Sequence, residues 1–165
     1  MKSTSLRRAA VAALVLAPVL AACGFNEQTD QPYQPATGVD NRDGQVDVLD
    51  ALIVSGSDGS GTFIASLVNK DQSQADALET VTGAGITTTD AKTSIAADGM
   101  VNLATDGKIA VTGSGVVAGD FVAVTLVFAN GQSTDLKVPV VRHDGDYASV
   151  PLPAATATPG AATTN

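Results

Sequence analysis

The segment from Asp120 to Val141 constrains the fold more than any other part of the chain. It reads DFVAVTLVFANGQSTDLKVPVV, in which two runs of alternating apolar residues flank Asn130-Gly131. Alternation with a period of two is typical of β-strands, and an Asn-Gly pair between two such runs predicts a hairpin, because both residues tolerate positive φ. Pro139 lies on the outward face of the second run and cannot donate to a ladder, so we expect an edge strand or a bulge there.

The rest of the apolar sequence also favours strands over helices. Gly56 to Gly61 predicts a hairpin loop, and Thr89 to Ala97 is the one candidate for a short helix. Short strands separated by Gly- and Asp-rich turns predict an all-β fold, an antiparallel β-sandwich. The further strands that we expect are Val46 to Val54, Thr62 to Asn69, Ala77 to Thr82, a strand near Met100 to Ala104, and Lys108 to Thr112.

The N-terminus has the pattern of a bacterial lipoprotein signal. Three basic residues precede the uncharged stretch Ala9 to Ala22. This stretch is too short for a transmembrane helix, which needs about 20 residues, and it suits the apolar region of a secretory signal. It leads into Leu20-Ala21-Ala22-Cys23, which resembles the lipobox of bacterial lipoproteins. We predict that residues 1–22 are removed as a signal peptide and that Cys23 is lipidated, which holds the protein on the extracytoplasmic face of the cell membrane.

The charge of the chain favours a lipid anchor over an electrostatic one. The 165 residues have a formal charge of −8, but removal of the signal would take three basic residues away and leave 6 Lys and Arg against 17 Asp and Glu. The resulting charge of about −11 repels nucleic acid and anionic lipid headgroups. We expect no nucleic-acid partner, and we expect attachment to the membrane through the lipid at Cys23.

Composition divides the mature chain into three parts. Residues 23–38 comprise the lipidated Cys and a Pro- and amide-rich segment without periodicity, which is typical of a flexible tether. Residues 39–150 carry the strands and form the β-sandwich domain. Residues 151–165 read PLPAATATPGAATTN and lack the apolar mass to offset their ordering entropy, so we predict a disordered Pro/Thr/Ala tail.

A group of residues at the start of the domain resembles a calcium-binding loop. With Gly44 at the sixth place of an EF-hand or dockerin loop, oxygen-bearing side chains fall at the third, fifth, ninth and twelfth places. The first place is Val39, however, and the residues that follow favour a strand over a helix. We therefore expect a solvated turn and keep a calcium-binding surface module as an alternative. The residues concerned are Asp40, Asn41, Asp43, Gly44, Asp47 and Asp50.

Few residues could carry catalysis. His143 is the only histidine, and Asp144 and Asp146 could orient it, but no nucleophile stands out beyond common Ser and Thr. Gly113 to Ala118 matches GxGxxA, yet Gly119-Asp120 breaks the chain where a dinucleotide site needs a helix. We predict that the protein is not an enzyme and that it has no catalytic residues and no cofactor.

Two segments resemble the PCu(A)C periplasmic copper chaperones. Gly119 to Val141 is similar to the last hairpin of that family, and Thr62 to Gly83 to its strand, Asn-containing turn and following strand. The lipobox, the acidic tether and the run Asn41 to Gly44 look more like the divergent actinobacterial members of the superfamily, the LpqE-like lipoproteins. The resemblance implies a cupredoxin-like or immunoglobulin-like sandwich.

The copper ligands of that family have no matching set in this sequence. The family binds cuprous ion with His and Met side chains, soft donors that suit this ion. Beyond the signal the chain has one Met, Met100, and one His, His143, so a two-coordinate site would require these two to approach each other. No family ligand set carries over, and we predict no metal site.

The function that we favour is a non-catalytic binding module at the cell envelope, with an unknown envelope protein as its partner. The anchor at Cys23 and the tether motivate this prediction. The alternative that the resemblance implies is a copper chaperone or metal-handling protein of PCu(A)C type with a degenerate ligand set.

Overall fold

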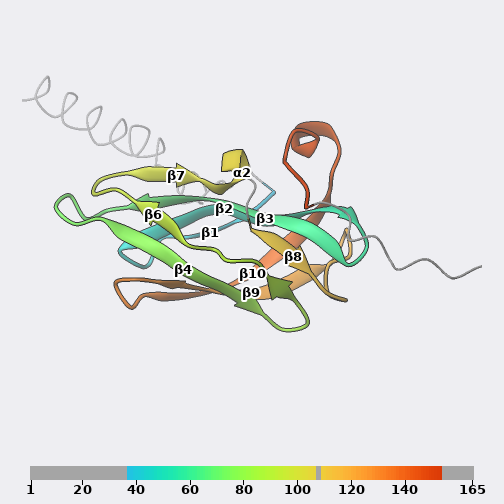
Figure 1. Cartoon of the computed structure of the whole chain (residues 1–165), viewed down its shortest axis with the longest axis horizontal. Coiled ribbons are helices and arrows are strands. Elements are labelled where there is room, and N and C mark those ends of the chain that lie inside the picture. Colours follow the sequence, from blue (N-terminus) through green and yellow to red (C-terminus); the bar gives the residue numbers. More distant parts are fainter. Residues whose placement is uncertain (1–36, 107–108, 154–165) are drawn as a thin grey trace, which may run out of the picture. The chain divides into compact units, whose positions relative to one another are not determined.

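The computed structural model describes residues 37–106 and 109–153, which form an almost entirely β-stranded domain (Figure 1). This confirms the predicted all-β class. The described helical elements are both short, α2 (Leu103–Asp106) and the 3-10 turn η2 (Gly145–Tyr147). The strands are β1 (Val39–Asn41), β2 (Val46–Ser57), β3 (Ser60–Asn69), β4 (Asp76–Gly83), β5 (Thr87–Thr88), β6 (Thr93–Ile95), β7 (Met100–Asn102), β8 (Ala110–Thr112), β9 (Phe121–Phe128) and β10 (Ser133–Arg142).

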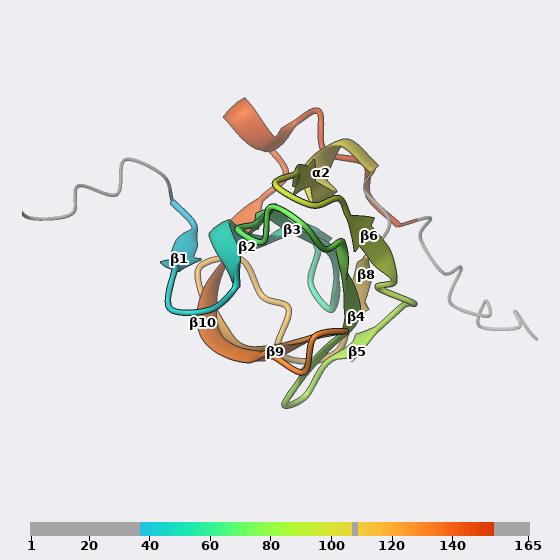
Figure 2. The ribbon, with the colours of Figure 1, turned by 90° about the vertical axis from the view of Figure 1, so that its left-hand side faces the viewer.

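The strands form a mixed sheet that curls around a common core (Figure 2). Its order is β5-β8-β3-β2-β10-β9-β4-β6, with β1 beside β2 and β7 beside β3. The described pairs are antiparallel except for β2 and β10, which run parallel from Val140 to Arg142. β10 therefore joins the β2–β3 half of the sandwich to the β9–β4 half, and both halves bury side chains in one core.

The hairpin predicted from the Asn-Gly pair joins β9 to β10. The two strands pair from Phe121 opposite Pro139 to Val127 opposite Ser133, and Gly131 in the turn adopts φ 88°, which most residues avoid. Successive side chains of a strand point to opposite faces, so the alternation in sequence becomes an alternation in burial. The buried apolar residues are Val122, Val124, Leu126 and Phe128 on β9 and Leu136, Val138 and Val140 on β10.

The expectation that Pro139 marks an edge strand is wrong. β10 lies between β2 and β9, and Pro139 is buried. It is the last residue of β10 that pairs with β9, and Val140 is the first that pairs with β2. The Val140 N–H donates to the Asp120 carbonyl at 2.9 Å, so Pro139 falls at the alternate position of the antiparallel ladder, where no N–H is directed at β9. The strand thus tolerates a proline where it changes partner.

Residues 89–97 contain a strand and not the short helix considered for them. Thr93–Ile95 forms β6, which pairs antiparallel with the start of β4. Tertiary pairing decides the outcome here, because β-branched side chains fit a pleated surface and Ile95 is fully buried. Of the strand predicted near Met100 to Ala104, the first three residues form β7, and the last two belong to the short helix α2.

A β-bulge at Asp50 lets β2 contribute to two apolar clusters. The pairing of β2 with β3 shifts between Leu49 and Leu52, and Asp50 adopts φ 52°. An extra residue in one strand reverses which side chains point to a given face. The main core receives Val46 and Val48 before the bulge and Ala51 and Ile53 after it, whereas Leu52 and Val54 face a second cluster.

The second cluster attaches the C-terminal segment to β2 and β3. Val150 is buried in it, and Tyr147 and Leu152 pack against it. Thr62 Oγ1 donates to the Pro151 carbonyl at 2.7 Å. The packed domain therefore includes Pro151 and Leu152, the first two residues of the predicted tail, while residues 154–165 lie outside the described part of the chain.

Two carboxylates hold the bulge in place. The Asp50 N–H donates to Asp40 Oδ1 at 2.8 Å, and the Gly38 N–H donates to Asp50 Oδ1 at 2.9 Å. Both bonds are partly buried and join β1 to β2 at the point where the ladder with β3 is interrupted. An N–H left unpaired at such a place costs free energy, so these acidic residues have a structural role.

Replacing Asp40 by Ala should destabilise the domain. The change removes the acceptor for the Asp50 N–H, and loss of one partner of a partly buried bond costs about 1–3 kcal/mol. Asp43→Ala is the control, because it removes the same charge from an exposed neighbour, where substitutions usually stay within about 0.5 kcal/mol. Urea unfolding measures both variants. Equal free energies of unfolding would contradict the structural role of Asp40.

Candidate functional site

Met100 and His143, the one Met and the one His in the sequence after residue 22, lie on different parts of the sandwich. Met100 is the first residue of β7, where it pairs with Val68 of β3 and is 66% exposed. His143 follows β10, and its N–H donates to the Ser55 carbonyl near the end of β2. Val68 in turn pairs with Asp47 near the start of β2, so Met100 lies level with the start of β2 and His143 lies beside its end.

This placement excludes a shared copper site. Ser55 lies eight positions after Asp47 along β2. At about 3.3 Å per residue, the two ends of that stretch lie roughly 26 Å apart, and a metal needs its donors within about 2–2.5 Å. The conceivable two-coordinate site of Met100 with His143 is therefore contradicted by the sheet register. Strand length keeps these two donors apart.

His143 has a structural contact that accounts for its position. Its Nε2 lies 2.9 Å from the Val150 carbonyl. A carbonyl oxygen can only accept, so Nε2 carries the proton and donates this bond. The bond ties the end of β10 to the buried Val150 and thus to the second cluster. The described ring contact goes to a backbone carbonyl and not to Asp144 or Asp146, the carboxylates considered as orienting partners.

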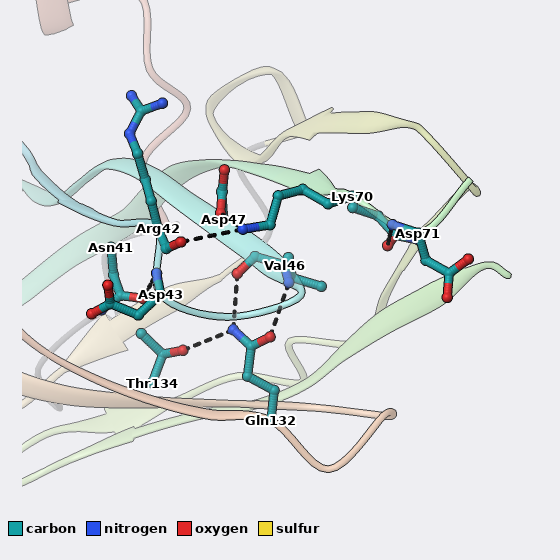
Figure 3. A network of polar contacts seen from close by, with 10 residues as sticks. Asn41, Arg42, Asp43, Val46, Asp47, Lys70, Asp71, Gln132 and Thr134 are labelled. Atoms are coloured by element: carbon teal, nitrogen blue, oxygen red, sulfur yellow. Dashed lines mark hydrogen bonds and ion pairs between the residues drawn. The ribbon is translucent and has the colours of Figure 1, made fainter. Parts of the chain in front are cut away.

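The segment with the calcium-loop resemblance, for which we expect a solvated turn, forms the hairpin between β1 and β2. Asn41 pairs with Val48, so the chain reverses direction as a β-hairpin and does not form the circular loop that surrounds calcium in an EF-hand. Asp40 pairs with Arg42 and accepts from the Asp50 N–H. Asp47 Oδ1 pairs with Lys70 Nζ at 2.8 Å, and both residues are labelled in Figure 3. These carboxylates are engaged in separate contacts. In residues 37–106 and 109–153 we find no group of three or more His, Cys, Asp or Glu that could hold a metal ion.

Gly44 has a steric role that differs from the calcium-loop position considered for it. A Cβ at Gly44 would clash with the side chain of Gln132. Gln132 Oε1 accepts from the Val46 N–H at 2.9 Å, and its Nε2 donates to the Val46 carbonyl at 2.8 Å and to Thr134 Oγ1 at 3.1 Å (Figure 3). The side-chain amide thus pairs with β2 as a strand residue would, and Gly44 leaves room for it.

A polar cavity of about 260 Å³, which we call the end cavity, lies where β3 ends and β4 begins. Its walls come from the β3–β4 loop, the β9–β10 turn and the residue before β2. Two alanines contribute to the lining, and its polar residues all bear amide or carboxylate groups. These polar residues are Gln45, Asn69, Asp71, Gln74, Asp76 and Asn130.

Asn69 lines the end cavity, and its side-chain hydrogen bonds hold the loop that forms one wall of it. It is only 1% exposed, and its Nδ2 donates to the Gln74 carbonyl at 2.8 Å and to the Ala96 carbonyl at 3.2 Å. Its Oδ1 accepts from the Asp71 N–H at 2.9 Å. One buried amide therefore holds both ends of the β3–β4 loop. This is the residue of the Asn-containing turn on which the family resemblance rests, but the sequence does not predict the cavity that it supports.

Asp71 is the exposed carboxylate of the end cavity. Its Oδ1 accepts from the Ser73 N–H, the Ser73 hydroxyl and the Gln74 N–H, at 2.8, 2.8 and 3.0 Å. These bonds, the one from the Ser73 backbone above all, lower the pKa of the Asp71 carboxyl below its usual value. Asp71 is consequently ionised at neutral pH, and its described hydrogen bonds leave Oδ2 free for another contact.

The fold is similar to that of solved PCuAC domains. The structure titled "Copper-bound PCuAC domain from PmoF2" aligns with a TM-score of 0.53 and 14% identity over 63% of this chain and 98% of that chain. "Apo PCuAC domain from PmoF1" aligns with a TM-score of 0.52 and 14% identity over 63% and 99%. At this identity the likeness concerns the fold. A scan against models of known families finds no match, and neither does a search of curated proteins.

Cys23, the predicted lipidation site, lies outside the described residues, as do the signal and nearly all of the tether. In the part of the chain that the structure describes, no helix is long and apolar enough to cross a membrane. The lipid anchor stays a prediction from the sequence.

Replacing Asn69 by Ala should loosen the β3–β4 loop. The change removes three partly buried hydrogen bonds, to two carbonyls and one N–H, and we expect a loss of at least about 2 kcal/mol in the free energy of unfolding. Gln74→Ala is the control, because the exposed Gln74 side chain lines the same cavity while its backbone carbonyl stays available to Asn69. Thermal and urea unfolding measure the difference. A similar loss in both variants would show that Asn69 has no special role.

Proposed function

We propose that this protein is a lipid-anchored, non-catalytic binding module at the extracytoplasmic face of a bacterial cell membrane, built on a PCuAC-type scaffold. The observation that carries the proposal is that the chain spans nearly the whole length of solved PCuAC domains, whereas Met100 and His143 lie at opposite ends of β2. The scaffold is kept, but its two soft donors cannot act together. The partner that we propose is an envelope protein.

The lipobox supports the proposed location. Leu20-Ala21-Ala22-Cys23 follows a basic, then apolar, segment, and the strong negative charge of the mature chain disfavours electrostatic attachment to anionic lipid. Two acyl chains suffice for stable anchoring, because each buried methylene contributes about 0.8 kcal/mol. The closer assignment to LpqE-like actinobacterial lipoproteins rests on the same residues and stays a prediction.

Cys23→Ser should release the protein from the membrane fraction. The serine hydroxyl cannot take the thioether-linked lipid, so the variant should lose incorporation of a labelled fatty acid and appear in the soluble fraction. Asn26→Ala, a change in the tether that leaves Cys23 intact, is the control and should stay with the membrane. Membrane retention of Cys23→Ser after a high-salt wash would refute the lipid anchor.

Copper handling is the second candidate function, and the structural likeness favours it more directly than it favours the general binding module. One of the similar structures is titled as copper-bound. Thioether and imidazole donors suit cuprous ion, and the exposed Met100 offers a thioether at the edge strand β7. His143 lies too far away to join it, so a copper site here would have to use Met100 without His143.

Competition against a chromophoric cuprous chelator separates the two candidates. We expect that micromolar protein takes no measurable copper from the chelator, because one thioether gives weak binding. His143→Ala and Met100→Leu should behave like the unchanged protein. Capture of one equivalent of copper that Met100→Leu abolishes and His143→Ala preserves would replace the binding module by copper handling.

A further inference from the structure

The end cavity contains a buried carboxylate that the fold does not fully pair. Asp76, the first residue of β4, is 9% exposed. It lies two residues before the fully buried Leu78 and on the same face of the strand, so its side chain points toward the interior. Asp76 is also one of the residues that line the end cavity. An acidic side chain in this position is unusual, since Asp is almost never buried unless it is paired.

The two oxygens of Asp76 have different surroundings. Oδ1 accepts from the Ala77 N–H at 2.7 Å and from the Asn130 N–H at 3.1 Å. Oδ2 is buried and has no hydrogen-bond partner among the described residues. A buried polar atom without a partner costs about 1–3 kcal/mol, and more when it is charged, so a bound water or ion is the usual explanation.

The surroundings of Asp76 favour a cation over other ligands. The side chains that line the end cavity include two carboxylates and four amides and no Lys, Arg or His. Lys70, the nearest basic residue in sequence, is directed elsewhere: its Nζ pairs with Asp47 Oδ1 at 2.8 Å and donates to the Arg42 carbonyl at 3.2 Å (Figure 3). The cavity therefore has two carboxyl groups among its lining residues and no basic residue beside them.

Further oxygen donors face the same cavity. Asp71 has Oδ2 available, because its described hydrogen bonds go to Oδ1. Gln45, Gln74 and Asn130 also line the cavity, and their side-chain amides carry neutral oxygens. The Asn130 oxygen already accepts from the Gln132 N–H at 2.7 Å. Carboxylates combined with amide oxygens and water form the donor set that hard cations prefer, and calcium accepts six to eight such ligands in flexible geometry.

We propose that the end cavity binds a hard divalent cation, calcium in particular, with Asp76 Oδ2 as its buried ligand and Asp71 as its second carboxylate. This site differs from the β1–β2 hairpin whose sequence resembles a calcium loop. It is also independent of the lipid anchor and of copper. Two carboxylates with neutral amide ligands give modest affinity, so we expect a dissociation constant of about 0.1–1 mM, in the range of extracellular calcium modules.

The test compares calcium binding by the full chain carrying Cys23→Ser with that of the same chain carrying Asp76→Asn in addition. Asparagine keeps the oxygen that accepts from Asn130 and removes the charge at Oδ2, so the variant should fold and, without calcium, be at least as stable. By isothermal titration we expect calcium binding to weaken at least 10-fold in Asp76→Asn. At 10 mM calcium the unfolding midpoint should rise by several degrees in the unchanged domain and by little in the variant.

Two further arms keep the proposal falsifiable. Asp43→Asn removes the same charge from the β1–β2 hairpin and should leave calcium binding unchanged, while Asp71→Asn should weaken it. Magnesium should bind more weakly than calcium, because it demands a tight octahedral site. No heat and no shift in the unfolding midpoint with 10 mM calcium would overturn the proposal. Equal binding by Asp76→Asn, or loss of binding in Asp43→Asn alone, would overturn it as well.

Discussion

The bulge at Asp50 is the constraint on which the rest of the domain depends. β2 contributes to both apolar clusters, and it can do so because an extra residue reverses its inward face halfway along. Without that reversal, Leu52 and Val54 would face the main core in place of Ala51 and Ile53. The second cluster, which holds Val150 and the C-terminal segment, follows from the same reversal. The acidic residues near the start of the domain are thereby explained as supports of the strand.

The two ends of the sandwich differ in chemistry. The end near His143 is closed by apolar packing and by side chains that bond backbone carbonyls, since His143 Nε2 donates to the Val150 carbonyl and Thr62 Oγ1 donates to the Pro151 carbonyl. The opposite end is polar and contains Asn69, Asp71 and Asp76 around the end cavity. A likeness to PCuAC domains therefore describes the scaffold, whereas the calcium site that we propose would use the oxygen-rich residues at the other end. Fold and site are separate questions in such a case.

Local sequence predicted the elements whose side chains alternate over a full strand. β9 and β10 satisfy both a period of two and a strong turn pair, so the pattern alone identified them. β6 was missed because Thr93–Ile95 is short and owes its conformation to the start of β4. The edge-strand prediction from Pro139 was wrong for a related reason. A proline is excluded only from ladder positions whose N–H must donate, and the sequence does not show whether residue 139 is such a position.

The sequence by itself determined the all-β class, the main hairpin, the strong negative charge and the predicted anchor at Cys23, because each depends on a local pattern or on a sum over residues. Tertiary structure alone decided that Met100 and His143 lie at opposite ends of β2, that Asp40 supports a bulge, and that Asp76 is buried. The physical reason is register. Which residues meet depends on how strands that are distant in sequence align, and a shift of one residue would move every side chain to the other face.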